Sequence, residues 1–536
     1  MKIILVILAL ALGMVREAQS VDLVFLNGRI LTMDDARPQA EALAVRGEYV
    51  HALGSNAQMR ALAEPKTQIV DLQGQMIVPG LIDSHIHAIR AGLTYATEAS
   101  WSQAQTIDEA LATLQKAARD LPEGGWIIVA GGWTPLQFKE GRRPSHDELE
   151  NAAPRHRLYV QELYQSVWLS SLARDTLLTH GSEAFSTLGI AEDGWLTGNA
   201  RSISNLYDLL PRPSLQQSIE GTRAFFRQLN AYGVTGVIDP GGYNMPLVAY
   251  EPVRHLARKN ELSLRIGYFI CAPNAGSERR DFEHFLETGF ANENTDHFRF
   301  LGFGENVVWG MYNNERPAAS DIASLIDVLD WAAQKKLSLT FHWNNAHSVH
   351  HLLGAIENIA HRHDLSPLRW SIAHLHDADL ASLQKMKKLE LGWLAQNALL
   401  WRGSPFLQQR GNGANPALAS ALRIGLPTGA GTDAHRVMDM NPFAVMQFMI
   451  SGRTIDGKIL RAPSERVSRE EALRLYTSGS AWFARQDKQR GMLQPGAWAD
   501  FAILDRDFLA IPDAEIHTIR AQKTFVGGQM VHEAQR

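Results

Sequence analysis

Short apolar runs alternate with segments of helical periodicity along most of the chain. This is the pattern of a parallel α/β sheet or barrel. Segments such as Ile322–Gln334 and Ala381–Lys388 have the helical pattern and lie between the runs. Eight successive β-then-α units fit a TIM (β/α)₈ barrel. The eight predicted strands are Met76–Asp83, Gly233–Asp239, Leu264–Ile270, Phe298–Glu305, Leu337–His342, Arg369–His374, Leu391–Gln396 and Leu426–Asp433.

One interval in this series is too long for a simple loop. About 150 residues separate the first and second predicted strands, far beyond a usual βα connection. Two further apolar runs, Trp126–Ala130 and Leu158–Val160, lie inside it. We therefore expect an inserted lobe between about residues 91 and 210.

The two ends of the chain share a different pattern. Near the N-terminus, Asp22–Thr32 reads as a strand, an Asn27-Gly28 turn and a second strand, and Ala499–Leu504 and Lys523–Val531 are similar. We expect one small β-sandwich built from residues 21–75 and 491–536, enclosing a barrel region of residues 76–490.

Composition changes this picture little. The chain has 536 residues, 45% of them hydrophobic and 20% charged, as in a globular protein with two or more structural units. The net charge of -5 is small for this length and gives no reason to expect nucleic acid or an anionic membrane as a partner. A small-molecule substrate is the expected partner, and the possibility of a homo-oligomer is left open.

The first 20 residues resemble a signal peptide. Lys2 precedes the apolar run Ile3–Leu12, and Ala18-Gln19-Ser20 supplies small residues at a cleavage-type position. The run is short for a membrane span, which needs roughly 20 apolar residues. We expect a periplasmic or secreted protein without stable membrane insertion after cleavage. The alternatives are a misassigned start, a disordered tail and an uncleaved membrane anchor. With Cys271 as the single cysteine, no intramolecular disulfide is possible.

Candidate metal ligands follow the predicted strands. His85 and His87 are two residues apart, so their side chains share one face at the end of the first strand. Singly, such residues have structural interpretations: His342 as a buried histidine, or Asp433 as a helix N-cap. Barrel enzymes, however, collect their catalytic groups at the carboxyl ends of the strands. These ends carry His85, His87, Glu305, His342, His374 and Asp433.

The sequence resembles the metal-dependent amidohydrolase superfamily, specifically its YtcJ-like branch, amidohydrolase family 3. Residues 79–87 (PGLIDSHIH) are similar to the family's first-strand motif. Similar motifs recur in the insertion at residues 131–133, 141–145 and 193–198, and in the tail at residues 491–500. The resemblance implies a distorted barrel with a small β-sandwich formed by both termini.

The resemblance also assigns roles. His85 and His87 would bind the more buried metal, and His342 and His374 the more exposed one. Asp433 would ligate a metal and act as the general base. The ligand types suit a divalent metal, with Zn²⁺ expected, as one or two ions.

The chain departs from the family pattern at several positions. Many two-metal relatives have a carboxylated lysine after the fourth strand, where this chain has Glu305. Glu305 is expected to bridge two ions; the alternative is a single-metal site. After the sixth strand His376 is the rival of His374 as ligand. Residues expected to contact substrate are Trp133, Gln165, Trp309, Trp343 and His435.

The leading functional hypothesis is a secreted hydrolase that cleaves a C–N bond in an amide or cyclic amide through metal-activated water. The alternatives are a mononuclear hydrolytic deaminase of a heterocycle and a catalytically silent binding protein on the same fold. The substrate cannot be read from the sequence.

Overall fold

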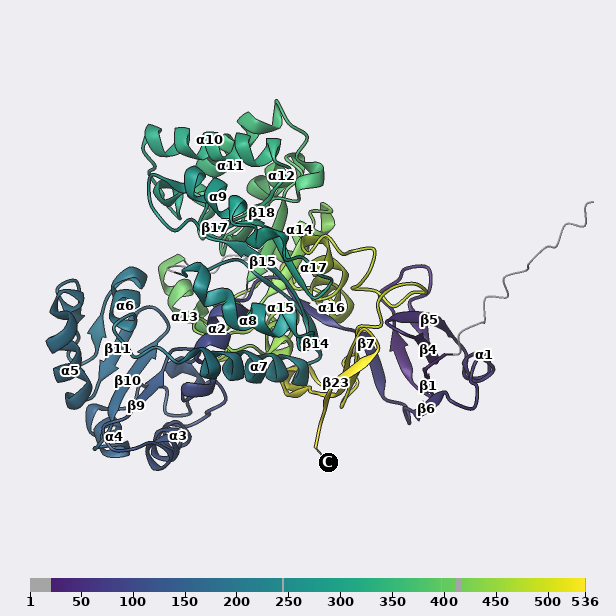
Figure 1. Ribbon diagram of the computed structural model, residues 1–536, viewed down its shortest axis with the longest axis horizontal. Coiled ribbons are helices and arrows are strands. Elements are labelled where there is room, and N and C mark those ends of the chain that lie inside the picture. Colours follow the sequence, from purple (N-terminus) through teal and green to yellow (C-terminus); the bar gives the residue numbers. More distant parts are fainter. Residues whose placement is uncertain (1–20, 243–244, 397, 411–416, 536) are drawn as a thin grey trace, which may run out of the picture.

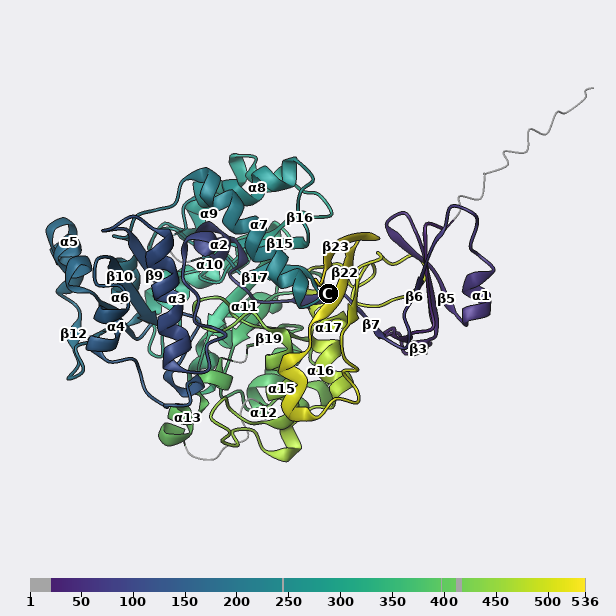
Figure 2. The same cartoon turned by 90° about the horizontal axis from the view of Figure 1, so that it is seen from below.

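The computed structural model describes residues 21–242, 245–396, 398–410 and 417–535. The predicted signal peptide, residues 1–20, lies outside the described residues. Figure 1 shows three parts along the longest axis: a lobe in blue, a central barrel, and a small β-rich unit in purple at the opposite end. Figure 2 shows the same order from a perpendicular direction.

The centre is a parallel eight-stranded barrel, as predicted. Its order is β8-β14-β15-β16-β17-β18-β19-β20. Ser84 N–H donates to the Ala430 carbonyl (3.0 Å) and Asp433 N–H to the His85 carbonyl (2.8 Å), which brings the last strand beside the first. The strands are β8 (Leu81–Asp83), β14 (Val234–Asp239), β15 (Arg265–Ile270), β16 (Phe298–Phe303), β17 (Ser338–Trp343), β18 (Ser371–His374), β19 (Gly392–Gln396) and β20 (Thr428–Gly431).

Seven of the predicted barrel strands correspond to single strands, but the first needs correction. The run 76–83 divides at Gly80 into β7 (Met76–Pro79), which belongs to the small β unit, and β8. A Cβ at Gly80 would lie 2.1 Å from Thr235 Oγ1 on β14, so a side chain does not fit where the chain enters the barrel. One apolar run therefore serves two sheets.

The β-sandwich is built from both termini. A four-stranded sheet (β5-β4-β1-β6) faces a six-stranded sheet (β23-β22-β21-β7-β2-β3). Phe25, Phe501 and Phe525 pack in its core with ring centroids 4.7–5.4 Å apart. The strands are β1 (Leu23–Leu26), β2 (Arg29–Leu31), β3 (Gln39–Ala40), β4 (Ala42–Arg46), β5 (Tyr49–Gly54), β6 (Gln68–Asp71), β21 (Phe501–Leu504), β22 (Ala521–Val526) and β23 (Gln529–Glu533).

The Asn27-Gly28 turn joins the two sheets of the sandwich. β1 pairs with β4 and β6, whereas β2 pairs with β3 and β7. Because the Arg29 N–H donates to the Gln75 carbonyl (3.0 Å), the chain after the turn joins β7 and does not fold back on β1. The two predicted strands exist, but not as a hairpin.

The inserted lobe has its own sheet, in the order β12-β13-β11-β10-β9, and its own cores. Its strands are β9 (Trp126–Val129), β10 (Arg157–Glu162), β11 (Ser166–Leu169), β12 (Gly189–Ile190) and β13 (Leu196–Thr197), and its helices are α3 (Ile107–Asp120), α4 (His146–Ala152), α5 (Ser171–Gly181) and α6 (Ala200–Tyr207).

Helices elsewhere lie around the barrel and beside the sandwich (Figures 1 and 2). The predicted segments 322–334 and 381–388 are helical; the second begins after Asp379, whose carboxylate accepts from Ser382 N–H as an N-cap. In the described part of the chain these helices are α1 (Asn56–Arg60), α2 (Ala88–Thr94), α7 (Leu215–Ala231), α8 (Glu251–Arg258), α9 (Glu278–Glu287), α10 (Ala319–Gln334), α11 (Ala346–Ala360), α12 (Leu380–Lys388), α13 (Leu399–Arg410), α14 (Leu418–Arg423), α15 (Pro442–Ser451), α16 (Arg469–Leu475) and α17 (Ser478–Phe483). None of the described helices is long and apolar enough to cross a membrane.

Candidate metal centre

Six side chains from five barrel strands meet at the carboxyl end of the barrel. They follow or end β8, β16, β17, β18 and β20, the positions at which barrel enzymes place reactive groups. Three overlapping groups have ligand atoms that all lie within 4.8 Å of one another. These groups are His85, His374 and Asp433; His85, His87 and Glu305; and Glu305, His342 and His374.

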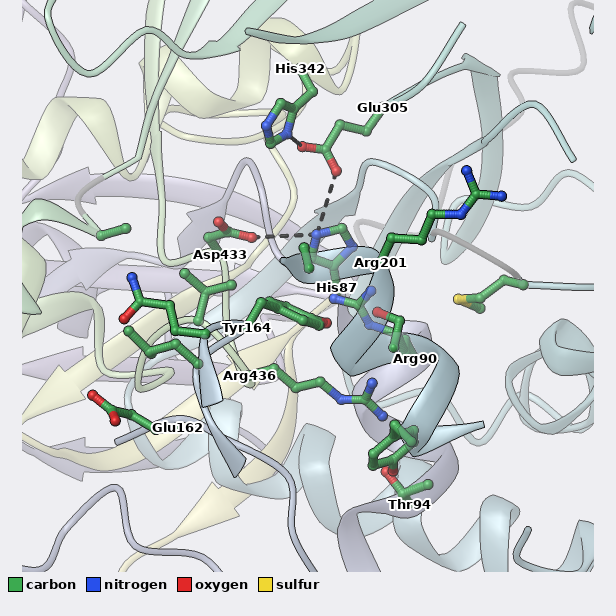
Figure 3. A pocket seen from close by; sticks show the side chains of 18 of the residues that line it. His87, Arg90, Thr94, Glu162, Tyr164, Arg201, Glu305, His342, Asp433 and Arg436 are labelled. Carbon is green, nitrogen blue, oxygen red and sulfur yellow. Dashed lines mark hydrogen bonds and ion pairs between the residues drawn. The ribbon is translucent and has the colours of Figure 1, made fainter. Parts of the chain in front are cut away.

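Glu305 lies in the middle of this cluster. Its Oε1 contacts His342 Nδ1 and lies 2.8 Å from His374 Nε2. Its Oε2 lies 3.6 Å from His87 Nε2, and Asp433 Oδ1 approaches the same His87 nitrogen to 3.3 Å (Figure 3). Oε1 also lies 3.8 Å from His85 Nε2. The Glu305 carboxylate thus lies between the two predicted histidine pairs, which is the placement a bridging ligand needs.

His85 and His87 have ring nitrogens available as lone-pair donors. His87 Nδ1 lies 2.8 Å from the Gly241 carbonyl, so it carries the proton and leaves Nε2 to face the cluster. Both ring nitrogens of His85 are buried and have no hydrogen-bond partner among the described residues. Burial lowers the pKa of His85 to about 3, so this ring is neutral at pH 7.

The two acids of the cluster are ionised. Burial opposes the charge of Asp433, but contact with His87 and the other neighbouring imidazoles holds its pKa at about 2. Burial also opposes the charge of Glu305, yet His342 and His374 hold its pKa well below the usual range. Buried orphan nitrogens beside ionised carboxylates fit a divalent cation, because imidazole and carboxylate are ligands that Zn²⁺ accepts.

The choice between His374 and His376 has a geometric answer. His374 belongs to two of the three ligand groups, whereas His376 belongs to none of those found in the described chain. The ring centroid of His376 lies 5.6 Å from that of His374, and His376 lines the cavity above the cluster. The geometry therefore places His374 among the candidate ligands.

Asp83 supports the cluster from below and had no assigned role in the sequence. Its Oδ1 accepts from His85 N–H (3.1 Å) and its Oδ2 from Thr432 Oγ1 (2.6 Å), so one carboxylate joins the ends of β8 and β20. Burial raises the pKa of Asp83 to about 7. The side-chain alternation that puts His85 and His87 on one face of the strand also puts Asp83 on that face. This alternation is the sequence signal that could have identified Asp83 as part of the site.

A cavity of about 1200 Å³ opens above the cluster. The barrel contributes loops after its strands, and the lobe contributes residues around the β10–β11 turn and on α6, including Tyr164 and Arg201 (Figure 3). Among the residues predicted to contact substrate, Gln165 and Trp309 line this cavity. Tyr312, which no sequence motif indicated, also lines it and stacks on His342 with ring centroids 4.7 Å apart.

The other three predicted contact residues lie outside the lining, which corrects the expectation for them. Trp133 is fully buried in the lobe, where its indole N–H donates to the Gln161 carbonyl (2.7 Å). Trp343 follows His342 on β17, so alternation turns it away from the barrel interior, and its indole donates to Ser348 Oγ (3.0 Å). His435 points toward the lobe, with Nε2 2.7 Å from Glu98 Oε2.

Comparison with known proteins gives a consistent result. The model of the Amidohydrolase family matches residues 68–532. The N-substituted formamide deformylase of Arthrobacter pascens is 22% identical over 96% of this chain and 98% of its own length. The putative amidohydrolase YtcJ of Bacillus subtilis is 23% identical over 95% of this chain and 98% of its own length.

Solved structures share the fold. An uncharacterized metal-dependent hydrolase from Pyrococcus horikoshii superposes with a TM-score of 0.67 at 17% identity, covering 92% of this chain and 99% of that chain. Atrazine chlorohydrolase TrzN from Arthrobacter aurescens, complexed with zinc, gives 0.54 at 15% identity, covering 95% of each chain. The family match spans most of the sequence and the ligand cluster has the matching chemistry, so this chain belongs to the amidohydrolase family and is a metal-dependent hydrolase.

Proposed function

We propose that this enzyme hydrolyses a C–N bond in an amide or cyclic amide. The observation that carries the proposal is the convergence of four histidines, Glu305 and Asp433 beneath one large cavity. Full-length likeness to an N-substituted formamide deformylase supports an amide as the scissile group. N-substituted formamides are therefore the first compounds to test.

The proposed metal is zinc, held as two ions. His85 and His87 would hold one ion, His342 and His374 the other, with Glu305 between them and Asp433 as a further ligand. When bound, a divalent cation lowers the pKa of a water towards about 7 and polarises a carbonyl oxygen. The structurally similar atrazine chlorohydrolase TrzN is complexed with zinc, which supports the choice of metal.

Asp433 is the proposed general base. The pKa of Asp433 is about 2, so its carboxylate is ionised at neutral pH. Asp433 lies at the floor of the cavity, where an attacking water would lose its proton. Asp433 would accept that proton as the water attacks the carbonyl carbon. It would then deliver the proton to the departing nitrogen as the C–N bond breaks, which leaves a carboxylic acid and an amine.

The test is the Asp433→Asn variant, assayed on N-substituted formamides, other N-acyl amides, cyclic ureas and aminated heterocycles. Amide hydrolysis is expected to fall by about 10²–10⁴-fold, the usual contribution of a general base. Because Asp433 is also a candidate ligand, metal content is measured in parallel. Asp327→Asn, on the exposed side of α10, is the matched control and should keep wild-type rates.

Other outcomes would favour the alternatives. Ammonia release from heterocycles, without amide hydrolysis, would support the deaminase. Absence of turnover by fully metal-loaded wild type on the whole panel would support a silent binding protein. A metal:protein ratio near one in fully loaded protein would contradict the glutamate bridge, for which we expect a ratio near two.

We also propose that the protein is exported and acts in the periplasm or outside the cell. The support is the sequence pattern of residues 1–20 alone. Sequencing the N-terminus of protein recovered from the periplasm and medium is expected to find a chain beginning at about residue 21. An intact Met1 on cytoplasmic protein would contradict export.

A further inference from the structure

Apolar side chains from three separate segments line one side of the cavity. They are Leu93 on α2, Leu215 at the start of α7, and Val248 in the 3₁₀ turn Leu247–Tyr250. We call these three residues the apolar rim.

Two residues of the apolar rim are unusually exposed for their type. Val248 is 73% exposed and Leu215 is 54% exposed, and Val248 is the most exposed large apolar side chain among the described residues. A single apolar side chain on a surface needs no explanation. Two that line one cavity, together with the half-buried Leu93, leave apolar surface that a ligand in the cavity can remove from water.

Helix packing keeps the apolar rim together. A side chain at Gly221 would clash with the Gly92 carbonyl, so α7 lies close against α2. The Ser218 hydroxyl also donates to the Leu93 carbonyl (3.0 Å). The 3₁₀ turn that carries Val248 packs against α2 as well. The rim therefore has α2 as its common support.

The same helix joins the apolar rim to the metal cluster. His87 is the N-cap of α2, Leu93 is six residues further along the helix, and both line the cavity. At about 1.5 Å per residue, about 9 Å of helix separates these two residues. An extended chain of about eight carbons, with bonds of about 1.5 Å, covers that distance.

The lobe makes its side of the cavity polar. Arg201 on α6 and Asp208 directly after it line the cavity and are exposed (Figure 3 shows Arg201). A wholly polar ligand would leave the apolar rim uncovered, whereas a ligand with an apolar chain can cover it. The rim therefore favours ligands that carry such a chain.

We propose that the apolar rim binds a hydrocarbon chain of the substrate, so that the enzyme acts on lipid-like amides with chains of about eight carbons or more. This inference rests on the proposed amide hydrolysis. The chain would run from the scissile bond past Leu93 to Leu215 and Val248. A fully buried methylene strengthens binding about fourfold, and about twofold per methylene is expected on a partly open rim.

Two pairs of probes test the inference and locate the chain. N-butylformamide and N-octylformamide carry the chain on the departing amine, whereas N-methylbutanamide and N-methyloctanamide carry it on the acyl group. Wild type is expected to prefer the longer member of at least one pair by about tenfold or more in kcat/KM. The pair with the larger ratio identifies the side of the scissile bond that faces the rim.

Three variants make the test specific. Val248→Asp and Leu215→Asp place a charge on the rim and should each reduce the preference for the longer chain by about fivefold. Both positions are exposed, so both variants should fold. Ile190→Asp is the matched control, because Ile190 is 63% exposed on β12 and lies outside the cavity lining. It should change the preference less than about twofold.

Binding separates this inference from the proposed reaction. Titration calorimetry of the longer and shorter probes on metal-loaded Asp433→Asn protein, with and without Val248→Asp, needs no turnover. Tighter binding of the longer probe that depends on Val248, without hydrolysis of any probe by wild type, would retain the rim and reject the amide reaction. Hydrolysis without a chain-length preference would retain the reaction and reject the rim.

Two other results would overturn the inference. One is a chain-length preference that survives in both rim variants or falls equally in Ile190→Asp. The other is a wild-type dimer in sedimentation that Val248→Asp dissociates while the chain-length preference stays unchanged, because the rim would then be a contact between copies of the chain.

Discussion

The barrel reaches the cavity through the ends of its strands, whereas the lobe reaches it through the β10–β11 turn, the segment 134–136 and helix α6. Every candidate ligand comes from the barrel, where the direction of a side chain follows from its place on a strand. The lobe supplies Tyr164, Gln165 and Arg201, whose direction depends on how the lobe docks. Strand register therefore places the candidate ligands in this fold, and packing between the units places the wall of the cavity.

Removal of the metal tests the barrel side and has the largest expected effect. Dialysis against a strong chelator is expected to lower hydrolysis by more than about 10³-fold, because both carbonyl polarisation and water activation depend on the cation. Adding Zn²⁺ should restore it, and circular dichroism should show the lobe and barrel still folded. Full activity in protein shown to be metal-free would contradict a catalytic role for a metal held by the barrel residues.

Trp133→Ala tests the lobe side through stability. Trp133 is fully buried against Trp101 and Phe138, so the substitution should cost about 3–5 kcal/mol of lobe stability. Trp309→Ala is the matched control, because this half-buried tryptophan lines the cavity and should alter KM more than the denaturation midpoint. Urea unfolding followed by fluorescence measures both. Similar effects of the two substitutions would contradict the different placements.

Glu98→Gln tests the junction between the two units. Glu98, at the start of the lobe, pairs with His435, two residues after Asp433. Burial opposes ionisation, but His435 and Arg436 hold the Glu98 pKa at about 2, below its ordinary 4.5. The ionised carboxylate thus stabilises the fold by roughly 3 kcal/mol above pH 4.5, and this is lost as the pH falls towards 2.

The wild-type advantage over Glu98→Gln should therefore be present at pH 7 and shrink between pH 4.5 and 2. Denaturation midpoints of both proteins at pH 7 and pH 3 measure it. Exposed Glu533→Gln should show a smaller difference at pH 7, since exposed ion pairs contribute little. A difference in denaturation midpoint that does not depend on pH would indicate that side-chain packing, not the charge of Glu98, stabilises the junction of lobe and barrel.

Gln165→Ala has the smallest expected effect. Gln165 lines the cavity from the lobe and belongs to none of the candidate ligand groups, so we expect a change in KM below about tenfold and an unchanged kcat. Steady-state kinetics on the best amide measures both constants. A large loss in kcat would mean that the lobe takes part in the chemical step.

Much of the barrel could be predicted because local pattern and strand direction agree there. The runs ending at His342 and His374 each became one strand, and their imidazoles point inward together. The boundary at Gly80 could not be predicted, because one continuous apolar run serves both the sandwich and the barrel. Trp133 and Trp343 looked like pocket walls since the sequence shows that a residue is aromatic, not which core will cover it.

The sequence by itself determined the fold class, the order of the ligands and the identity of the acids and imidazoles. These follow from side-chain alternation and from the rule that strand ends carry chemistry. Only the tertiary structure decided that Glu305 faces both histidine pairs and that His374, not His376, belongs to the candidate ligand groups. Those relations join residues from tens to hundreds of positions apart, and long-range packing, which no local pattern encodes, brings them together.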